Sequence, residues 1–284
     1  MHKAVEPGKD INKMECEVQG IPIYYETIGD GRPFLMLHGG YVDHRHMIDD
    51  LEPIFAKHPN WKRIYPDLPG HGRTPARDWL VNQDQVLDIT LGFIDQVIPG
   101  QSFAVAGASR GAYLIRGILA KRPAAVAGAL LIVPARYVVA PAGTLPEKVT
   151  LVEDENILAE LKPSERAMFN GYVVQSRKTL DATRKVMPAL ELTDYAFQER
   201  ILQNYEFSFD VDQRPSSFEK PSLIVVGKQD SVVGYSDAWK MLKQFPRATF
   251  AVLDKAGHYL GSEQDELLHA LATEWLQRVE EHPS

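Results

Sequence analysis

A serine flanked by two glycines is the feature of this sequence that most directly suggests chemistry. Ser109 lies in the segment Gly-Ala-Ser-Arg-Gly, residues 107–111, directly after an apolar run, 102–106, and directly before a helical pattern, 113–121. A strand, then Gly-x-Ser-x-Gly, then a helix is the setting of a nucleophilic serine on a strained turn. Glycines without Cβ atoms let the strand and the helix approach closely around that turn. The segment therefore predicts that Ser109 is a nucleophile.

An aspartate and a histidine follow in an order that could activate this serine. Asp230 comes just after the apolar run 222–226, and His258 comes just after the predicted strand 247–253. A histidine can take the serine proton and later protonate the leaving group, while an aspartate fixes the tautomer of its ring. We therefore predict a triad of Ser109, Asp230 and His258. The rival acidic residues are Asp254, Asp210 and Asp212.

Backbone N–H groups near the serine could stabilise the negative charge that develops on a carbonyl oxygen. One donor is the N–H of Arg110, at the predicted start of the helix. A second is expected from His38-Gly39-Gly40, which follows another short apolar run, 34–37. We favour Gly40 over Gly39 or Tyr41 as this second donor. Together these N–H groups predict an oxyanion hole.

The elements that must position these residues alternate along most of the chain. Expected strands are residues 15–18, 21–27, 34–37, 63–65, 103–106, 129–133, 222–226 and 247–253, and the first two form an antiparallel edge pair. Expected helices are residues 47–57, 83–97, 113–121 and 264–281. This alternation predicts an α/β fold with a mostly parallel central sheet covered by helices on both faces.

The pattern changes between residues 137 and 212, which are rich in charged and helix-forming residues and contain no buried strand run. Helices are expected over residues 153–161, 163–177, 178–186 and 194–205. An inserted helical segment of this kind predicts a lid over the carboxyl edge of the sheet, where open α/β sheets place their sites.

Composition and charge exclude several classes of protein. The chain has 284 residues, a net charge of −7 and no cluster of basic residues, so a nucleic-acid partner is not expected. The polar residues 1–13 do not resemble a signal peptide, no apolar run approaches 18 residues, and Cys16 is the one cysteine. We therefore expect a cytoplasmic protein without a membrane partner, either a monomer or a homodimer, that acts on a small molecule.

Taken together, these motifs resemble the α/β-hydrolase superfamily from about residue 15 to residue 281. The resemblance implies an α/β-hydrolase fold whose core comprises residues 1–136 and 214–284, with an inserted helical cap at 137–213 that shapes the substrate pocket. It also implies that Asp67-Leu68-Pro69-Gly70-His71-Gly72 is a structural turn and that His71 is a supporting residue.

The resemblance leaves some residues without a family role. Arg110 follows the nucleophile where a smaller or apolar residue is more usual, and its guanidinium could pair with a carboxylate of the cap, with an acidic substrate group, or lie at the surface. His44 and His46 raise the question of a metal, but the histidine that a di-metal pattern needs soon after them is missing. Because phosphate-binding glycine motifs are also missing, we expect no metal and no cofactor.

The sequence favours a cofactor-free serine hydrolase, similar to a carboxylesterase, that cleaves a small hydrophobic acyl ester through an acyl-enzyme on Ser109. Aromatic residues expected near pocket or cap positions are Tyr41, Phe169, Tyr172, Tyr205, Phe207 and Tyr259, and all of these except Phe207 are expected in the substrate pocket. Three alternatives stay open. The same triad could cleave a C–C bond, lactone or amide, or act as a lyase; the protein could be a non-catalytic receptor for a small ligand; or the hydrolase could depend on a metal.

Overall fold

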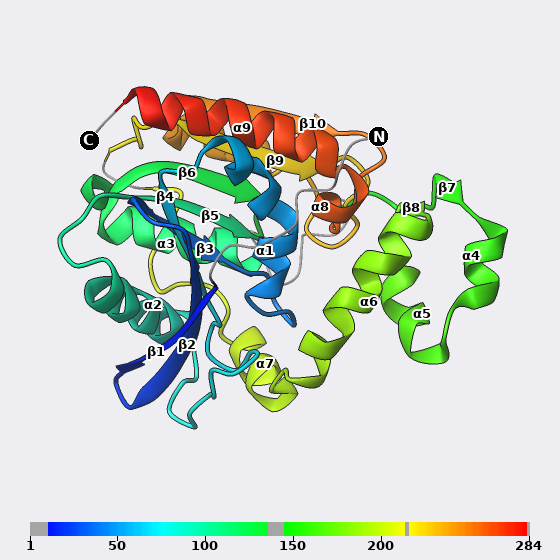
Figure 1. Ribbon diagram of the computed structural model, residues 1–284, viewed down its shortest axis with the longest axis horizontal. Coiled ribbons are helices and arrows are strands. Elements are labelled where there is room, and N and C mark those ends of the chain that lie inside the picture. The colour runs from blue at the N-terminus through cyan, green and yellow to red at the C-terminus, as the bar shows by residue number, and fades with distance from the viewer. Residues whose placement is uncertain (1–10, 136–144, 214–215, 283–284) are drawn as a thin grey trace.

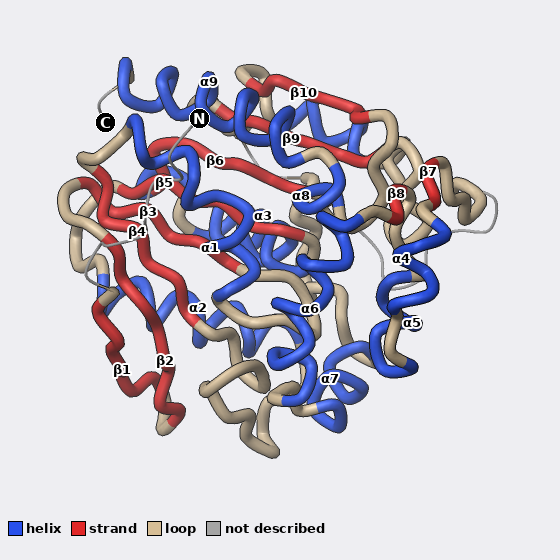
Figure 2. The backbone as a smooth tube through the Cα atoms, turned by 45° about the vertical axis from the view of Figure 1, so that its right-hand side comes forward, coloured by secondary structure: helices blue, strands red, loops and turns tan. Residues whose placement is uncertain are grey.

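The computed structural model describes residues 11–135, 145–213 and 216–282, and its centre is an eight-stranded sheet in the order β1-β2-β4-β3-β5-β6-β9-β10. The strands are β1 (Asn12–Val18), β2 (Ile21–Ile28), β3 (Arg32–Leu37), β4 (Trp61–Pro66), β5 (Phe103–Ala108), β6 (Val126–Ile132), β9 (Ser222–Gly227) and β10 (Ala248–Leu253). β1 pairs antiparallel with β2 and β2 with β4, while every pair from β4 to β10 is parallel. Figure 2 shows these strands as one twisted sheet. The predicted mostly parallel sheet with its antiparallel edge pair is confirmed.

Helices cover both faces of the sheet because successive side chains of the buried strands point to opposite faces. Phe34 and Met36 pack on one side, and Leu35 and Leu37 pack on the other. The first face is covered by α1 (Arg45–Leu51), the 3₁₀ helix η1 (Glu52–Lys57) and α9 (Asp265–Glu281). The second is covered by α2 (Gln83–Val97), α3 (Arg110–Lys121) and η3 (Ala238–Gln244). Two shorter elements are η2 (Pro123–Ala125) and α8 (Leu260–Glu263).

The segment between β6 and β9 lies at the end of the molecule toward which the parallel strands point (Figure 1). It contains β7 (Val152–Glu153), α4 (Glu155–Glu160), α5 (Pro163–Phe169), β8 (Val174–Gln175), α6 (Arg177–Glu191) and α7 (Tyr195–Leu202). A small hydrophobic cluster that includes Ile157, Phe169 and Leu180 holds α4, α5 and α6 together. In contrast, Phe197 and Ile201 of α7 belong to the core cluster under α2 and α3. This segment between β6 and β9, called the cap below, therefore has its own hydrophobic core at one end and contributes to the main core at the other.

Several predicted helices are wrong in their extent; the helix expected over residues 178–186, for example, continues to Glu191. The helix expected over residues 163–177 ends at Phe169, because the chain turns at Gly171 and then forms β8, which pairs in parallel with β7. The helix expected over 47–57 starts at Arg45 and changes to a 3₁₀ helix at Glu52, where Pro53 has no N–H to continue the α-helical bonding. Among the described residues, no helix is long and apolar enough to span a membrane.

Candidate active site

Ser109 forms the turn between β5 and α3 and has a strained backbone. Its φ of 51° and ψ of −113° lie outside the regions that a residue with a side chain prefers. The flanking glycines are sterically required. A Cβ atom on Gly107 would lie 2.7 Å from the carbonyl carbon of Gly111, and one on Gly111 would lie 2.1 Å from the carbonyl oxygen of Leu37. Close packing of β3, β5 and α3 thus presents the serine at the carboxyl edge of the sheet.

Loops after β9 and β10 bring Asp230 and His258 to this serine. The Oγ atom of Ser109 lies 3.1 Å from Nε2 of His258, and Nδ1 of His258 lies 2.9 Å from Oδ2 of Asp230. Asp230 is fully buried, and its Oδ1 accepts hydrogen bonds from the N–H groups of Val232 and Val233. This geometry lets Asp230 accept the Nδ1–H, which leaves the lone pair of Nε2 directed at the serine hydroxyl.

Each member of this pair shifts the pKa of the other. Burial lowers the pKa of His258, but the charge and hydrogen bond of Asp230 outweigh burial and raise it above the usual histidine value. Burial raises the pKa of Asp230, but His258 and the two backbone N–H donors outweigh that effect and lower it. Asp230 is therefore ionised, and a proton taken up by His258 is stabilised.

The rival carboxylates have other partners among the described residues. Asp254 accepts a hydrogen bond from the side chain of Gln229 at 2.8 Å, and Asp212 accepts one from Arg116 at 2.6 Å. Asp210 accepts the N–H of Asp212 at 2.8 Å. The described part of the chain therefore brings Asp230, and none of these three, to His258.

Two backbone N–H groups beside Ser109 lack a protein partner within the described ranges: those of Gly40 and Arg110. The neighbours of Gly40 are occupied. The N–H of Gly39 points to Nδ1 of His46 at 3.4 Å, and that of Tyr41 points to Nε2 of His71 at 3.3 Å. Gly40 and Arg110 thus have the free donors that an oxyanion would need.

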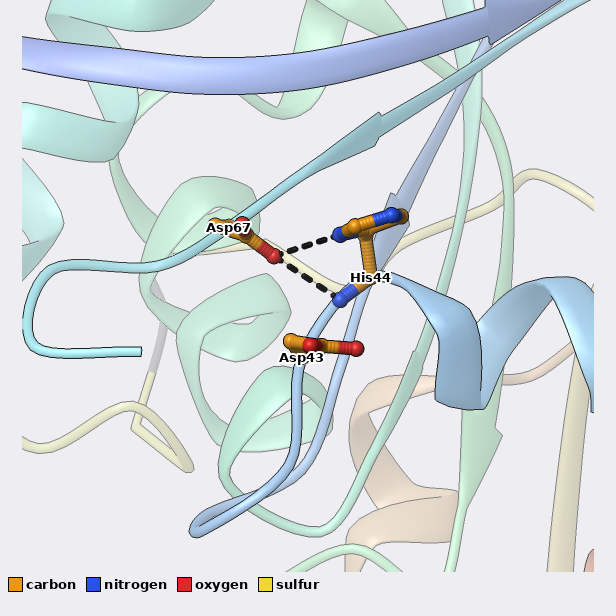
Figure 3. A group of neighbouring side chains, drawn as sticks. All are labelled: Asp43, His44 and Asp67. Carbon is orange, nitrogen blue, oxygen red and sulfur yellow. Dashed lines mark hydrogen bonds and ion pairs between the residues drawn. The ribbon is translucent and has the colours of Figure 1, made fainter. Parts of the chain in front are cut away.

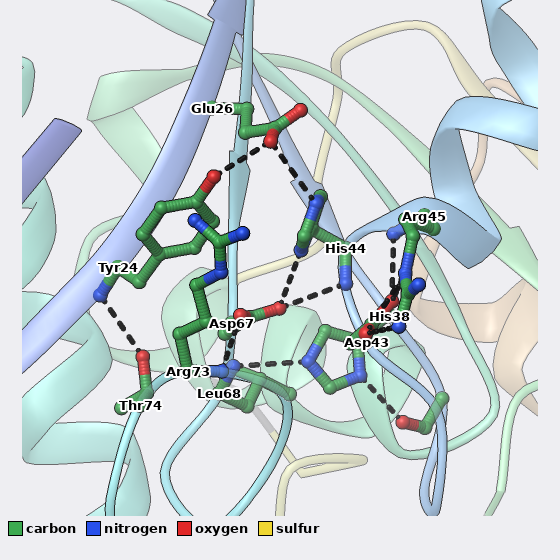
Figure 4. Close-up of polar contacts among 11 residues, drawn as sticks. Tyr24, Glu26, His38, Asp43, His44, Arg45, Asp67, Leu68, Arg73 and Thr74 are labelled. Carbon is green, nitrogen blue, oxygen red and sulfur yellow. Dashed lines mark hydrogen bonds and ion pairs between the residues drawn. The ribbon is translucent and has the colours of Figure 1, made fainter. Parts of the chain in front are cut away.

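A buried polar network holds the loop that carries Gly40 (Figure 4). Asp67, after β4, accepts hydrogen bonds from the N–H of His44 at 3.0 Å, from its Nδ1 at 2.7 Å, and from the N–H of Arg73 at 2.9 Å. His38 donates from Nδ1 to the carbonyl of Gly39 at 2.7 Å and accepts the N–H of Leu68 at 2.9 Å. The segment 67–72 is therefore a structural turn whose side chains fix the loop after β3.

His71 contributes to this network as a neutral residue. It donates from Nδ1 to the carbonyl of Pro69 at 2.9 Å and accepts the N–H of Tyr41 through Nε2. Burial keeps the pKa of His71 well below its ordinary value, and burial likewise lowers the pKa of His38 to about 4. Both rings therefore stay uncharged and act as hydrogen-bond bridges.

One group of possible metal ligands lies among the described residues, Asp43, His44 and Asp67, and Figure 3 shows how they face one another. Their donor atoms are already engaged. Nδ1 of His44 forms a hydrogen bond with Asp67. The carboxylate of Asp43 accepts a hydrogen bond from Nε–H of Arg45 at 2.9 Å. Burial lowers the pKa of His44, but hydrogen bonds to Asp67 and Glu26 outweigh it and raise the pKa to about 9. A protonated imidazole has no lone pair to offer a metal, so this donor set fits an ion-pair network better than a metal site.

Two cavities meet at Ser109 and His258. The smaller has a volume of about 80 Å³ and extends past Ile132 and Tyr172 to His46 and Asp50. The larger, of about 520 Å³, is lined by apolar and aromatic side chains between the cap and the core, among them Leu190, Tyr195 and Val232. Ser109 thus lies where two compartments meet.

The predicted pocket residues divide between these cavities and the protein core. Tyr41, Tyr205 and Tyr259 line the larger cavity, and Tyr172 and Tyr259 line the smaller one. Phe169 lines neither cavity, because it fills the cluster inside the cap. Phe207 stacks on Tyr113 in the main core, with 4.4 Å between ring centroids. The expectation that Phe169 lines the pocket is therefore wrong, because Phe169 packs inside the hydrophobic cluster of the cap, while Phe207, expected at a pocket or cap position, packs in the main core.

The Arg110 side chain is not at the surface, and it is not paired with any carboxylate of the described cap residues, 145–213. It is 4% exposed and lines the larger cavity, and its Nη1 donates to the amide oxygen of Gln198 on α7. The cap does provide its partner, as one alternative anticipated, but that partner is uncharged.

Glu263 is a residue that sequence reasoning missed. This buried side chain of α8 accepts the N–H of Gly257 at 2.6 Å and the N–H of Val173 at 2.5 Å. Gly257 precedes the candidate base His258, and Val173 leads into β8 of the cap. One carboxylate therefore ties the His258 loop to the cap. The contact spans about ninety residues of sequence, and no local motif marks it.

Comparisons with known proteins agree with this architecture. The model of the alpha/beta hydrolase family matches residues 34–271. The pimeloyl-(acyl-carrier protein) methyl ester esterase of Legionella pneumophila (strain Corby) is 21% identical, over 90% of this chain and 99% of that protein. An alpha/beta superfamily hydrolase of Oenococcus oeni PSU-1 has a TM-score of 0.82 at 24% identity, covering 91% of this chain and 96% of that one. A thermophilic esterase of Thermogutta terrifontis has a TM-score of 0.68 at 20% identity, covering 96% and 100%.

The match to the family model extends over most of the chain, from β3 into α9. This protein belongs to the alpha/beta hydrolase family. The predicted superfamily and α/β-hydrolase fold are confirmed.

Proposed function

We propose that this protein is a cofactor-free serine hydrolase of the carboxylesterase type, which cleaves a small ester through an acyl-enzyme on Ser109. The observation that carries the proposal is the continuous contact from Asp230 through His258 to Ser109, at 2.9 and 3.1 Å. The N–H groups of Gly40 and Arg110 beside it, which have no partner among the described residues, support the proposal, as do the esterase names of the relatives.

In this mechanism, Nε2 of His258 takes the Ser109 proton while Oγ attacks the ester carbonyl. The tetrahedral oxyanion accepts hydrogen bonds from the N–H groups of Gly40 and Arg110. The protonated His258 then gives its proton to the alcohol oxygen as the C–O bond breaks. Water, deprotonated by His258, attacks the acyl-enzyme and releases the acid and free Ser109.

The substrate argument rests on the two cavities. The apolar and aromatic lining of the larger cavity suits a hydrophobic chain, and the smaller one has room for a small group. A short acyl ester would place its scissile carbonyl where the two compartments meet. The pimeloyl ester in the name of the Legionella relative has a chain of this general kind.

Hydrolysis of p-nitrophenyl acetate and butyrate, together with fluorophosphonate labelling, tests the proposal. We expect Ser109→Ala to lose roughly 10⁶-fold in kcat and all labelling. Ser208→Ala, a change at an exposed serine, serves as the matched control and should retain both. Labelling without turnover would redirect the proposal to C–C, lactone or amide chemistry or to a receptor. If both labelling and turnover are absent, the assembled triad is refuted.

A further inference from the structure

Arg110 is a buried cation that has no negative partner among residues 11–135, 145–213 and 216–282. Its side chain meets the neutral amide of Gln198 and the ring of Tyr205, whose centroid lies 5.6 Å from Cζ. Its Nε is buried and has no hydrogen-bond partner in the part of the chain that the structure describes. No carboxylate of the described residues forms an ion pair with it.

The two further arginines that are buried among the described residues differ from Arg110 in this respect. Arg63 is 0% exposed and bonds through Nε to the carboxylate of Glu52 at 2.8 Å. Arg116, on the same helix as Arg110 and 1% exposed, bonds through Nη2 to Asp212 at 2.6 Å. The Nε of Arg116 also lacks a partner, so the distinguishing feature of Arg110 is the missing carboxylate.

A guanidinium stays charged in any protein environment, because its pKa exceeds that of every other side chain. Moving such a charge out of water is unfavourable unless an anion compensates it. An uncompensated position of this kind is therefore expected where a ligand supplies the missing charge.

The position of Arg110 indicates which ligand this is. The residue lines the larger cavity together with Ser109, Gly40 and His258. A Cβ atom built on Gly40 would lie 3.8 Å from Cζ of Arg110, so the guanidinium packs beside the loop of the proposed oxyanion hole. An anionic group bound by Arg110 would therefore occupy the compartment that opens onto the nucleophile.

We propose that Arg110 binds a carboxylate of the substrate, so that the ester cleaved at Ser109 carries a free carboxylate a short chain away. The inference rests on the proposed function. One cation calls for a monoanion, which favours a carboxylate over a doubly charged phosphate. The reaction converts the monoanionic half-ester of a dicarboxylic acid and water into an alcohol, the dicarboxylate and a proton released to solvent. Alternatively, the carboxylate that binds Arg110 belongs to the alcohol part of the ester, as in an acetyl ester of a hydroxy acid.

Matched esters test this inference. Monomethyl and dimethyl esters of malonate, succinate, glutarate and adipate would be compared by kcat/KM, alongside acetyl esters of glycolate and lactate and their methyl esters. We expect a roughly 10- to 100-fold preference for the charged member of at least one pair. Arg110→Gln should reduce the ratio of kcat/KM for the charged ester to kcat/KM for its neutral partner at least tenfold. In Arg116→Gln, the control on the same helix, the ratio should stay as in the wild type.

Gln198→Glu provides a second test that does not remove the arginine. The new carboxylate would pair with Arg110, so we expect a higher Tm together with loss of the preference for charged esters. If Arg110 has a merely structural role, Gln198→Glu would raise the Tm without changing the preference for charged esters. Isothermal titration of Ser109→Ala with monomethyl glutarate and dimethyl glutarate reports binding without turnover.

The outcomes separate the two proposals. Ser109-dependent hydrolysis of neutral esters, with no charged ester preferred or with the ratio unchanged in Arg110→Gln, would overturn the inference and leave the proposed function intact. Binding of monomethyl glutarate that requires Arg110, without labelling or turnover at Ser109, would support the anion site and refute the proposed hydrolysis.

Discussion

Nδ1 of His44 lies 2.7 Å from Oδ1 of Asp67, and this contact joins the loop after β3 to the loop after β4. Both residues are buried, and both loops belong to the edge of the sheet that holds Ser109. The polypeptide that carries Gly40 is thus fixed by an ion pair rather than by apolar packing alone.

Asp67→Asn removes the negative half of this pair and leaves a buried imidazolium. We expect a loss of about 3–5 kcal/mol in the free energy of unfolding, measured by urea denaturation at pH 7. We also expect a lower kcat, since the loop that presents Gly40 loses its anchor. Asp95→Asn breaks the exposed ion pair with Arg122 and should cost less than about 1 kcal/mol. Equal losses in the two variants would contradict the importance of the buried pair.

The stability of the protein should depend on pH through His44. Its pKa rises from 6.5 to about 9 on folding, so its contribution is fully present below pH 6.5 and is lost as the pH rises through 9. The difference amounts to about 3 kcal/mol. Urea denaturation at pH 6, 8 and 10 would measure it, with His44→Gln as the reference. A wild-type advantage over this variant that does not shrink between pH 6 and pH 10 would refute the charged histidine.

Activity should depend on pH through His258, which must be neutral to accept the serine proton. Because its pKa is raised, the acid limb of kcat/KM should have a midpoint above 6.5. Asp230→Asn removes the charge that raises this pKa, so we expect the midpoint to fall and kcat to drop roughly 10⁴-fold. An unchanged midpoint in Asp230→Asn would assign the limb to another group.

A chelator should leave activity unchanged, because the donor atoms of Asp43, His44 and Asp67 already serve one another and Arg45. The measurement is ester hydrolysis after dialysis against EDTA, with and without added Zn²⁺ or Mn²⁺. Metal analysis of the purified protein is the control. Activity lost with EDTA and restored by one ion would establish the metal-dependent alternative.

Glu263→Gln should loosen the link between the His258 loop and the cap. An amide has one acceptor oxygen for donors that now approach both carboxylate oxygens, and its NH₂ would face a backbone N–H. We expect a loss of about 1–3 kcal/mol in the free energy of unfolding and faster hydrogen exchange at residues 172–175 and 257–259. Glu266→Gln, at an exposed position of α9, is the control. Exchange that stays unchanged in Glu263→Gln would show that the cap is held by other contacts.

The sequence predicts the sheet and the order of the triad because local patterns encode both. Short apolar runs define the strands, and Ser109, Asp230 and His258 each follow one of them. The partner of Arg110 and the contacts of Glu263 could not be predicted, since each depends on how the cap packs against a core distant in sequence. The prediction that Phe169 lines the pocket is wrong for a related reason: helical spacing indicates a buried face but does not indicate what covers that face.

The cap leaves the sheet after β6 and the chain re-enters it at β9, the strand that pairs with β6. β6 and β9, the strands on either side of the insertion, are therefore hydrogen-bonded directly to each other. Changes in length between β7 and α6, the part of the insertion that has a core of its own, would leave the pairing of β6 with β9 in register. Recombination between relatives could exchange caps without rebuilding the sheet.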